Sequence, residues 1–270
     1  MSVLSNNDFD SILSEFRGAV ERSISNSRDI AWLEGILNMI SSRMYMMTMR
    51  QDILIQAELF KGSSILDFGT GSGICAFFLS KIGFNVTGID ITEFQNDLSS
   101  HATMKYEQEL LWSELLKVSP LLSLVHYSGS VPFVDNYFSD TVAYAVLEHI
   151  PDSELSFSIN EIKRVMRSDG TLFVSRLPRK YSYAEWLSKL FRIGHHDKLY
   201  SKNEILSLMN DCGFQVIFYE ENDMFPSYPS TITNAIFPIL SQIENIFLKT
   251  PLRKFSHHQR FSCTRVIVNE

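Results

Sequence analysis

The stretch that decides the fold is ILDFGTGSG, residues 65–73, in which glycine stands at every second position from Gly69 to Gly73. The residues before the glycines are typical of a buried β-strand, and those after them are typical of a helix. Because glycine has no Cβ, the turn can adopt unusual dihedrals while a ligand lies against the main chain. The free N–H groups and the positive dipole end of the following helix point to the same place. We therefore expect an anionic or nucleotide-like ligand at this turn.

The next strand along the chain supports a nucleotide. NVTGID ends on Asp90, 17 residues after Gly73, and a carboxylate at that point can accept hydrogen bonds from both hydroxyls of a ribose. The alternative is a tight turn followed by an aspartate that only caps a helix. Because the glycines and Asp90 occur together in register, the pattern favours the nucleoside site.

The spacing of the glycines narrows the kind of nucleotide. The chain has GxGxG, and Ile74 stands where the GxGxxG pattern of nicotinamide and flavin sites needs its last glycine. No GK[ST] follows, which excludes a phosphate-binding P-loop. Asp67 precedes the glycines. Its charge would repel a pyrophosphate but attract an amino group, which fits a nucleoside that carries an amino acid.

Outward from this stretch, short apolar strands alternate with helical segments, which predicts an α/β fold with a doubly wound, mostly parallel sheet. The predicted strands are residues 64–68, 85–90, 121–127, 139–147, 170–177, 213–220 and 261–269. We expect an N-terminal helical lid (1–60), a nucleotide-binding core (61–220), a helical insertion over the acceptor (221–259) and a final strand of the core (260–270). Ligands of such sheets bind at the carboxyl ends of the strands.

Composition limits the function classes. The 24 Lys and Arg against 31 Asp and Glu offer no global attraction to nucleic acid. The three cysteines lie far apart, so neither a disulfide framework nor a structural zinc is indicated. No apolar run reaches the ~20 residues that span a bilayer, and the first residues lack the features of a secretion signal. We expect a cytoplasmic protein of 270 residues.

Two long stretches resemble a known family. Residues 65–92, ILDFGTGSGICAFFLSKIGFNVTGIDIT, are similar to the first two motifs of the class I S-adenosylmethionine-dependent methyltransferases. VPFVDNYFSDTVAYAVLEHIPD, residues 131–152, resembles the LEH segment of the subfamily that acts mainly on small molecules, sugars and lipids. The resemblance implies a Rossmann-like sheet of seven strands with the last strand antiparallel, and S-adenosyl-L-methionine as the cofactor.

The resemblance also implies a set of cofactor-binding residues. Those expected at the methionine portion are Asp67, Gly69, Gly71 and Gly73. Asp90 is expected on the ribose, Ile91 against the adenine and Leu147 at the back of the site. The chain departs from the family after the third strand, where Ser128 and Ser130 replace an acidic residue that often binds the adenine amino group.

The catalytic candidates are His149 and Glu148, where the fourth strand opens toward the cofactor. If the acceptor is a hydroxyl, a neutral histidine is a suitable proton acceptor at cytoplasmic pH. In the alternative interpretation His149 caps the loop and Glu148 forms a salt bridge. The loop with His195 and His196 is a second place for the base.

Two related motifs are incomplete or missing. Some ubiquinone-pathway O-methyltransferases carry ExxEH here and are thought to bind a divalent metal through it. Ala145 replaces the first Glu in this chain, so we predict no metal. The [DN]PP[FYW] loop of nucleic-acid adenine methyltransferases is absent at this place, which argues against DNA or RNA as the acceptor.

The C-terminal part of the chain bears on the acceptor. Residues 249–265 contain five Lys or Arg and no acid, after an apolar helical face in 236–248. Such a segment fits peripheral contact with the inner membrane surface through 236–265, or a lid with a solvated basic edge. We favour O-methylation of a sugar, glycan end or similar small acceptor, as in polysaccharide biosynthesis. The alternatives are methylation of a prenylated quinone or other lipid, and a methyltransferase-like module that binds the cofactor without turnover.

Overall fold

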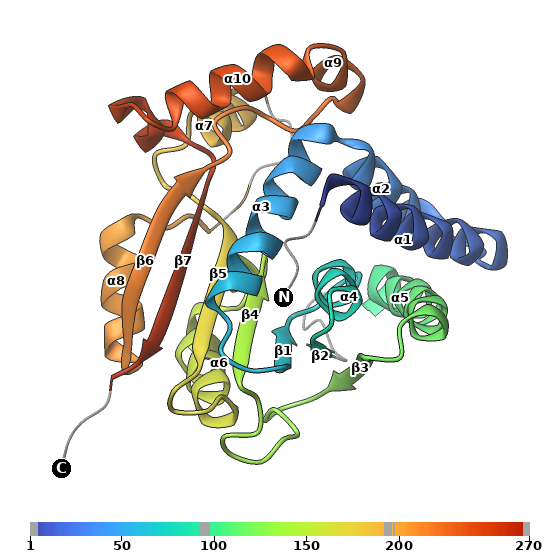
Figure 1. Cartoon of the computed structure of the whole chain (residues 1–270), viewed down its shortest axis with the longest axis vertical. Helices are drawn as coiled ribbons and strands as arrows, with labels where there is room; N and C mark the ends of the chain where they lie inside the picture. Colours follow the sequence, from blue (N-terminus) through green and yellow to red (C-terminus); the bar gives the residue numbers. More distant parts are fainter. Residues whose placement is uncertain (1–4, 92–97, 192–195, 197, 267–270) are drawn as a thin grey trace.

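The computed structural model describes residues 5–91, 98–191, 196 and 198–266 (Figure 1). The strands are β1 (Ser64–Phe68), β2 (Asn85–Ile91), β3 (Leu122–Tyr127), β4 (Asp140–Tyr144), β5 (Thr171–Pro178), β6 (Phe214–Asn222) and β7 (His258–Arg265). The helices are α1 (Asn6–Asn26), α2 (Ala31–Ser41), α3 (Arg43–Leu59), α4 (Ile74–Lys81), α5 (Leu98–Val118), α6 (Asp152–Val165), α7 (Tyr183–Phe191), α8 (Lys202–Asp211), α9 (Ser230–Ala235) and α10 (Phe237–Phe247). Two short 3-10 turns are η1 (Leu147–His149) and η2 (Pro251–Phe255).

The strands form one seven-stranded sheet in the order β3-β2-β1-β4-β5-β7-β6. β1 pairs in parallel with β2 and β4, and β4 pairs in parallel with β5. β7 is antiparallel to both of its neighbours, β5 and β6. The predicted fold, a doubly wound sheet whose last strand is antiparallel, is confirmed.

Each face of the sheet has its own apolar core. Helices α1 to α5 cover one face, and α6 and α8 cover the other. The sequence pattern of α6 shows why it packs there, since Leu155, Ile159 and Ile162 recur at helical spacing and are buried. α8 begins with a capping box, in which Ser201 and Glu204 each accept a hydrogen bond from the other's main-chain N–H.

The first helix of the N-terminal segment packs against the core. On α1, Phe9 packs against Phe78 of α4 with ring centroids 4.7 Å apart, and Phe16 packs against Phe77 at 5.7 Å. All four rings are buried. Burial of this much aromatic surface holds α1 firmly against α4.

The fourth strand is shorter than predicted. It ends at Tyr144 because Ala145 adopts a left-handed conformation with φ of 52°, which an extended strand cannot continue. The chain then forms η1, so the LEH segment is a 3-10 turn rather than the end of a strand. The insertion between the last two strands is helical in its middle, as expected, but it begins after Asn222 and ends before His258.

One edge of the sheet carries the additional helices. β6 points toward α7, α9 and α10 in Figure 1, at the edge where the parallel strands have their carboxyl ends. In the described part of the chain, no helix combines the length and apolar character needed to cross a membrane.

Candidate functional site

The glycine turn lies between β1 and α4. All three glycines of the turn are left-handed, with φ of 72° at Gly69, 54° at Gly71 and 78° at Gly73. This conformation favours glycine because in other residues the Cβ would lie too close to a main-chain carbonyl oxygen. A Cβ on Gly69 would lie 2.2 Å from Cγ2 of Val146, whereas a Cβ on Gly71 would meet nothing within 4 Å. The turn therefore packs against the end of β4 on one side and is open on the other.

Asp67 lies under this turn with no exposed surface. One carboxylate oxygen, Oδ2, accepts hydrogen bonds from the Thr70 hydroxyl at 2.6 Å and from the Ala76 N–H at 3.1 Å. Oδ1 has no partner among the described residues. Burial raises the pKa of Asp67 to about 7.

Asp90, at the end of β2, meets the turn directly. Its carboxylate accepts hydrogen bonds from the N–H of Gly71 at 2.7 Å and from the N–H of Ile91 at 2.8 Å. Burial nevertheless raises the pKa of Asp90 above its ordinary value. The side chain of Ile91 is 39% exposed next to it. The two features that the sequence predicted to share one nucleoside are thus in contact.

Two side chains of α5 also reach this place, and the sequence analysis missed them. The Gln108 amide donates to the Gly71 carbonyl at 2.8 Å and to the Asp90 carboxylate at 3.2 Å. The Trp112 indole N–H donates to the same carbonyl at 3.0 Å. Gln108 and Trp112 are four residues apart, so they lie on the same face of α5. This spacing is the only signal of their contact with the turn that the sequence contains.

The two polar side chains of the LEH turn differ in their exposure to solvent. The Leu147 and Glu148 side chains are buried, whereas that of His149 is 67% exposed. Nε2 of His149 lies 3.9 Å from Oε1 of Glu148, and Oε2 of Glu148 has no partner among the described residues. Burial raises the pKa of Glu148 to about 7, while the charges of His196 and Arg176 oppose this.

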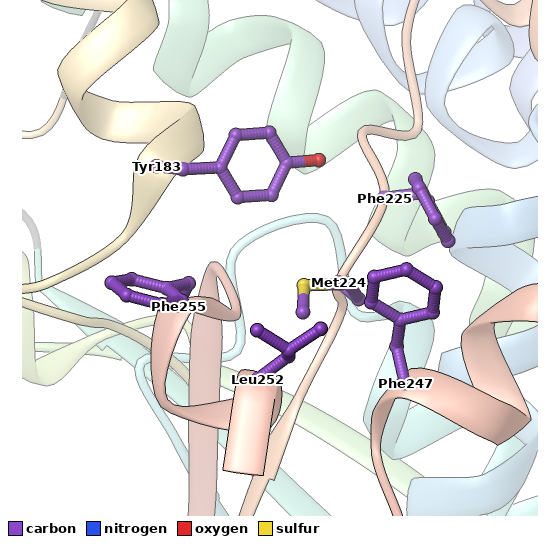
Figure 2. A pocket seen from close by; sticks show the side chains of 6 residues that line it. All are labelled: Tyr183, Met224, Phe225, Phe247, Leu252 and Phe255. Atoms are coloured by element: carbon purple, nitrogen blue, oxygen red, sulfur yellow. The ribbon is translucent and has the colours of Figure 1, made fainter. Parts of the chain in front are cut away.

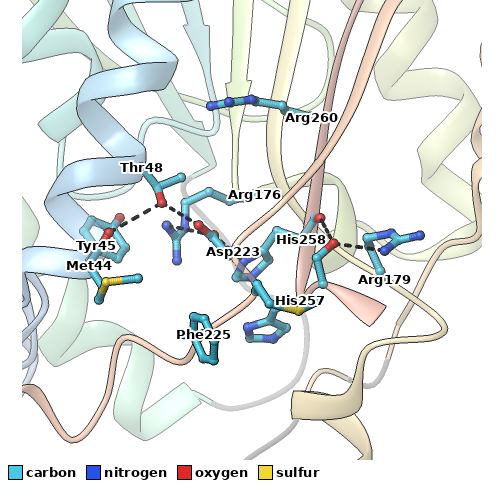
Figure 3. Close-up of polar contacts among 12 residues, drawn as sticks. Met44, Tyr45, Thr48, Arg176, Arg179, Asp223, Phe225, His257, His258 and Arg260 are labelled. Carbon is cyan, nitrogen blue, oxygen red and sulfur yellow. Dashed lines mark hydrogen bonds and ion pairs between the residues drawn. The ribbon is translucent and has the colours of Figure 1, made fainter. Parts of the chain in front are cut away.

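A buried ion-pair network, also missed from the sequence, joins α3, β5, β7 and the segment after β6 (Figure 3). The Arg176 guanidinium stacks on the Tyr45 ring at 4.1 Å, and its Nη1 lies 3.5 Å from the Asp223 carboxylate. Asp223 also accepts hydrogen bonds from the Thr48 hydroxyl and from Nδ1 of His258, the latter at 2.7 Å. Burial lowers the pKa of His258 to about 3, so this imidazole is neutral.

His196 is the described member of the predicted histidine loop, and His195 lies outside the described residues. Nδ1 of His196 lies 2.6 Å from Oε1 of Glu185 on α7. Nε2 of His257, just before β7, lies 2.8 Å from the same oxygen. Three potential ligand groups thus come together from three separate segments.

An apolar cavity of about 310 Å³ opens next to these groups, between α7, α10, η2 and the segment after β6 (Figure 2). Its lining residues are Tyr183, Met224, Phe225, Phe247, Leu252 and Phe255. Met224 follows Asp223, and Tyr183 lies two residues before Glu185. Residues that line the cavity are therefore close in sequence to Asp223 of the ion-pair network and to Glu185 of the histidine cluster.

The predicted basic segment is not a continuous surface. Arg260 is buried in β7, where it pairs with Asp52 at 2.8 Å and with Glu220 at 2.6 Å. Arg265 donates to main-chain carbonyls of Lys163 and Met166. The exposed cations of this region are Lys249, Arg253 and Lys254.

Comparisons with known proteins identify the family of the chain. A family model described as a methyltransferase domain matches residues 43–218. The ubiquinone biosynthesis O-methyltransferase of Psychrobacter arcticus is 28% identical over 163 residues, which are 57% of this chain and 59% of that protein. Its counterpart in Actinobacillus pleuropneumoniae is 30% identical over 150 residues, 50% of this chain and 58% of that protein. The chain therefore spans about three fifths of the length of these relatives.

Solved structures show the same fold at low sequence identity. Magnesium protoporphyrin IX methyltransferase from Synechocystis, solved with bound SAH, has a TM-score of 0.55 and 15% identity, with 97% of this chain and 96% of that chain covered. A putative methyltransferase of Haloferax volcanii, in complex with the Trm112 activator, has a TM-score of 0.57 and 14% identity, with 96% and 99% covered. Because the family model covers well over half of the 270 residues, the chain belongs to the methyltransferase domain family.

Proposed function

We propose that this protein is an S-adenosylmethionine-dependent O-methyltransferase whose acceptor carries an apolar tail. The observation that carries the proposal is the contact between the glycine turn and Asp90, with the apolar cavity at the same edge of the sheet. When bound, the sulfonium cofactor supplies an activated methyl group. The chain's task is then to orient the acceptor, exclude water and accept a proton.

The residues of the turn fit this cofactor. The open side of Gly71 leaves room against the main chain. Oδ1 of Asp67 is unpaired but buried, so it would bind the amino group of the methionine portion only after a shift of the turn. A carboxylate offers about four acceptor sites, and three at Asp90 are already used. The Gln108 amide, at 3.2 Å, makes the longest of these bonds. We expect it to give way when ribose hydroxyls bind.

His149 is our candidate for the proton acceptor. Its exposed imidazole can reach an acceptor hydroxyl, which the buried Glu148 carboxylate cannot. At 3.9 Å, Glu148 is close enough to stabilise the imidazolium that would form. Val146 packs against the glycine turn, so the same short segment adjoins the cofactor.

The lining of the cavity favours a lipid-like acceptor over a sugar. Apart from the Tyr183 hydroxyl, its side chains offer no group that hydrogen-bonds well to sugar hydroxyls, and an unpaired polar group in such a cavity is costly. The relatives named ubiquinone biosynthesis O-methyltransferase agree with this choice. We therefore prefer the quinone or lipid alternative to the sugar acceptor that the sequence favoured.

Exposed apolar side chains around the cavity support contact with a membrane that holds such an acceptor. Trp186 and Leu190 on α7 are 64% and 60% exposed, and Ile239 and Ile246 on α10 are both 61% exposed. The cations Lys249, Arg253 and Lys254 lie on the adjoining segment. Apolar groups flanked by cations are suited to an anionic bilayer surface.

The test combines binding and turnover. Calorimetry with S-adenosylmethionine and its demethylated product should show binding of both, and labelled methyl groups should enter a hydroxylated polyprenyl phenol in detergent micelles. Absence of binding to either nucleoside would overturn the whole proposal. Methyl transfer to nucleotide sugars alone would overturn the lipid acceptor, and binding without transfer to either acceptor class would favour a non-catalytic module.

A further inference from the structure

We propose that Glu185, His196 and His257 form a binding site for one divalent transition-metal ion. Their ligand atoms, Oε1 of Glu185, Nδ1 of His196 and Nε2 of His257, all lie within 4.8 Å of one another. Both imidazole nitrogens approach the same carboxylate oxygen, at 2.6 Å and 2.8 Å. This site is separate from the LEH turn, where the missing Glu at Ala145 led the sequence analysis to expect no metal.

The size of the cluster suits a metal ion. Metal bonds to imidazole nitrogen and carboxylate oxygen are about 2.0–2.2 Å long, so ligand atoms around one ion lie roughly 3–3.5 Å apart. The carboxylate oxygen and each nitrogen, now 2.6 and 2.8 Å apart, need to separate by about 0.2–0.9 Å to admit the ion. Without an ion, each nitrogen must carry a proton and both N–H groups must share a single oxygen.

The three ligands are held in place by a second layer of contacts. The other carboxylate oxygen of Glu185, Oε2, accepts a hydrogen bond from the main-chain N–H of His196 at 3.1 Å. The main-chain N–H of His257 donates to the main-chain carbonyl of Asp223 at 2.8 Å. The imidazole ring of His257 stacks on that of His258, with ring centroids 3.9 Å apart. Such outer contacts fix ligand orientation and raise metal affinity.

The surroundings allow an ion to enter. The Glu185 side chain is 4% exposed, but those of His196 and His257 are 33% and 23% exposed. The ion would thus have a buried anionic ligand and a side open to solvent. The positive charge of Arg176 acts on His196 and would repel a cation there. The ion pair of Arg176 with Asp223 reduces this repulsion, because the carboxylate offsets the charge.

The ligand set indicates the class of metal. Two imidazoles and one carboxylate suit Zn²⁺, Fe²⁺, Co²⁺, Ni²⁺ or Mn²⁺, whereas Mg²⁺ and Ca²⁺ prefer oxygen ligands alone. Three protein ligands leave at least one coordination position open. If the proposed function holds, that position would bind an oxygen of the acceptor and fix its orientation beside the apolar cavity.

The experiment measures metal binding directly, without cofactor or acceptor. Tag-free protein, freed of metal by chelation and dialysis, is titrated with Co²⁺ and followed by its visible absorption, and Zn²⁺ is then added as a competitor. We expect one Co²⁺ per chain, displaced by Zn²⁺. Glu185→Gln, which keeps the size of the side chain, and His257→Ala should each weaken Co²⁺ binding at least about tenfold.

The control is His126→Gln, because His126 stacks on Trp112 away from the three ligands, and it should bind Co²⁺ like the unmodified protein. Circular dichroism checks that each variant is folded, and His196→Ala replaces any variant that is not. No stoichiometric Co²⁺ binding by the unmodified protein, or equal binding by the ligand variants, would overturn the site. Calorimetry with the demethylated cofactor, run on the same preparation, tests the proposed function separately.

Discussion

The main-chain N–H of Gly71 donates a hydrogen bond of 2.7 Å to the carboxylate of Asp90. This bond joins the turn after β1 to the end of β2, two strands that pair in parallel with Asp67 opposite Gly88. Asp90 therefore holds the turn in shape, and under the proposed function it also offers a carboxylate to the ribose of the cofactor.

Replacing Asp90 should weaken cofactor binding in a graded way. A hydrogen bond to a charged group contributes about 1.5–3 kcal/mol, so Asp90→Ala should lower the affinity for the demethylated cofactor at least about tenfold in calorimetry. Asp90→Asn should lose less, because its amide oxygen can still accept from Gly71. Asp169→Ala, at an exposed aspartate paired with Arg167, is the control. Unchanged affinity in Asp90→Ala would remove this residue from the site.

The two glycines of the turn should respond differently to alanine. In Gly69→Ala the new Cβ would lie 2.2 Å from Val146 at a φ of 72°, so collision and backbone strain together should cost about 2–4 kcal/mol. Gly71→Ala has no collision and should cost only the strain, about 1–2 kcal/mol. Urea unfolding measures both.

The double variant Gly69→Ala with Val146→Ala separates the two causes. Measured relative to Val146→Ala alone, removing the Val146 methyl groups should recover the part of the lost stability that comes from the 2.2 Å contact with Cγ2, while the 2.9 Å approach to the Val146 Cβ and the strain at position 69 remain. The interpretation fails if Gly69→Ala is no less stable than Gly71→Ala.

The raised pKa of Asp67 predicts that the free energy of unfolding depends on pH. The pKa of about 7 in the folded protein lies above the ordinary value of 3.8. Between these pH values the folded protein binds a proton that the unfolded chain does not, so the free energy of unfolding falls as pH rises. Asp67→Asn stays neutral throughout. Relative to this variant, the unmodified protein should lose about 2–3 kcal/mol between about pH 5 and about pH 8.

Urea unfolding of both proteins across this pH range gives the difference, in which the other titrating groups cancel. A difference that is constant with pH would mean that Asp67 is ionised throughout the range, and would contradict the raised pKa of its buried carboxyl.

The sequence contained enough information to predict the turn, Asp90 and the sheet, because these depend on local patterns of glycine, apolar alternation and strand ends. It could not predict the pairing of Arg176 with Asp223. That pair depends on left-handed conformations at two non-glycine residues, with φ of 56° and 59°, which carry no residue signature. Strain of this kind is found at functional sites and is held in place by the surrounding fold.

Distance along the chain explains the other omissions. Glu185 and His257 are 72 residues apart, and each is an ordinary surface residue type in its own segment. The position of His149 was evident from the LEH motif, but its exposure was not, because the end of β4 depends on the backbone of Ala145.

His149 should affect turnover but not cofactor binding. His149→Ala should reduce kcat by about a hundredfold or more, as is usual for loss of a general base, with the dissociation constant of the demethylated cofactor unchanged. Glu148→Gln should reduce kcat less, because its carboxylate acts through His149. Full turnover of His149→Ala with a hydroxyl acceptor would refute the assignment.

The apolar cavity can be tested by filling it. Leu252 lines the cavity but is 44% exposed, so Leu252→Trp can be accommodated without repacking the core. The larger side chain should occupy space meant for the acceptor tail. KM for a long-chain polyprenyl phenol should therefore rise about tenfold or more, whereas KM for a tail-less phenol should not change. Ile217→Trp, at a 54% exposed position on β6 outside the cavity lining, serves as the matched control. An equal rise of KM for both acceptors in Leu252→Trp would show that the cavity does not hold the tail.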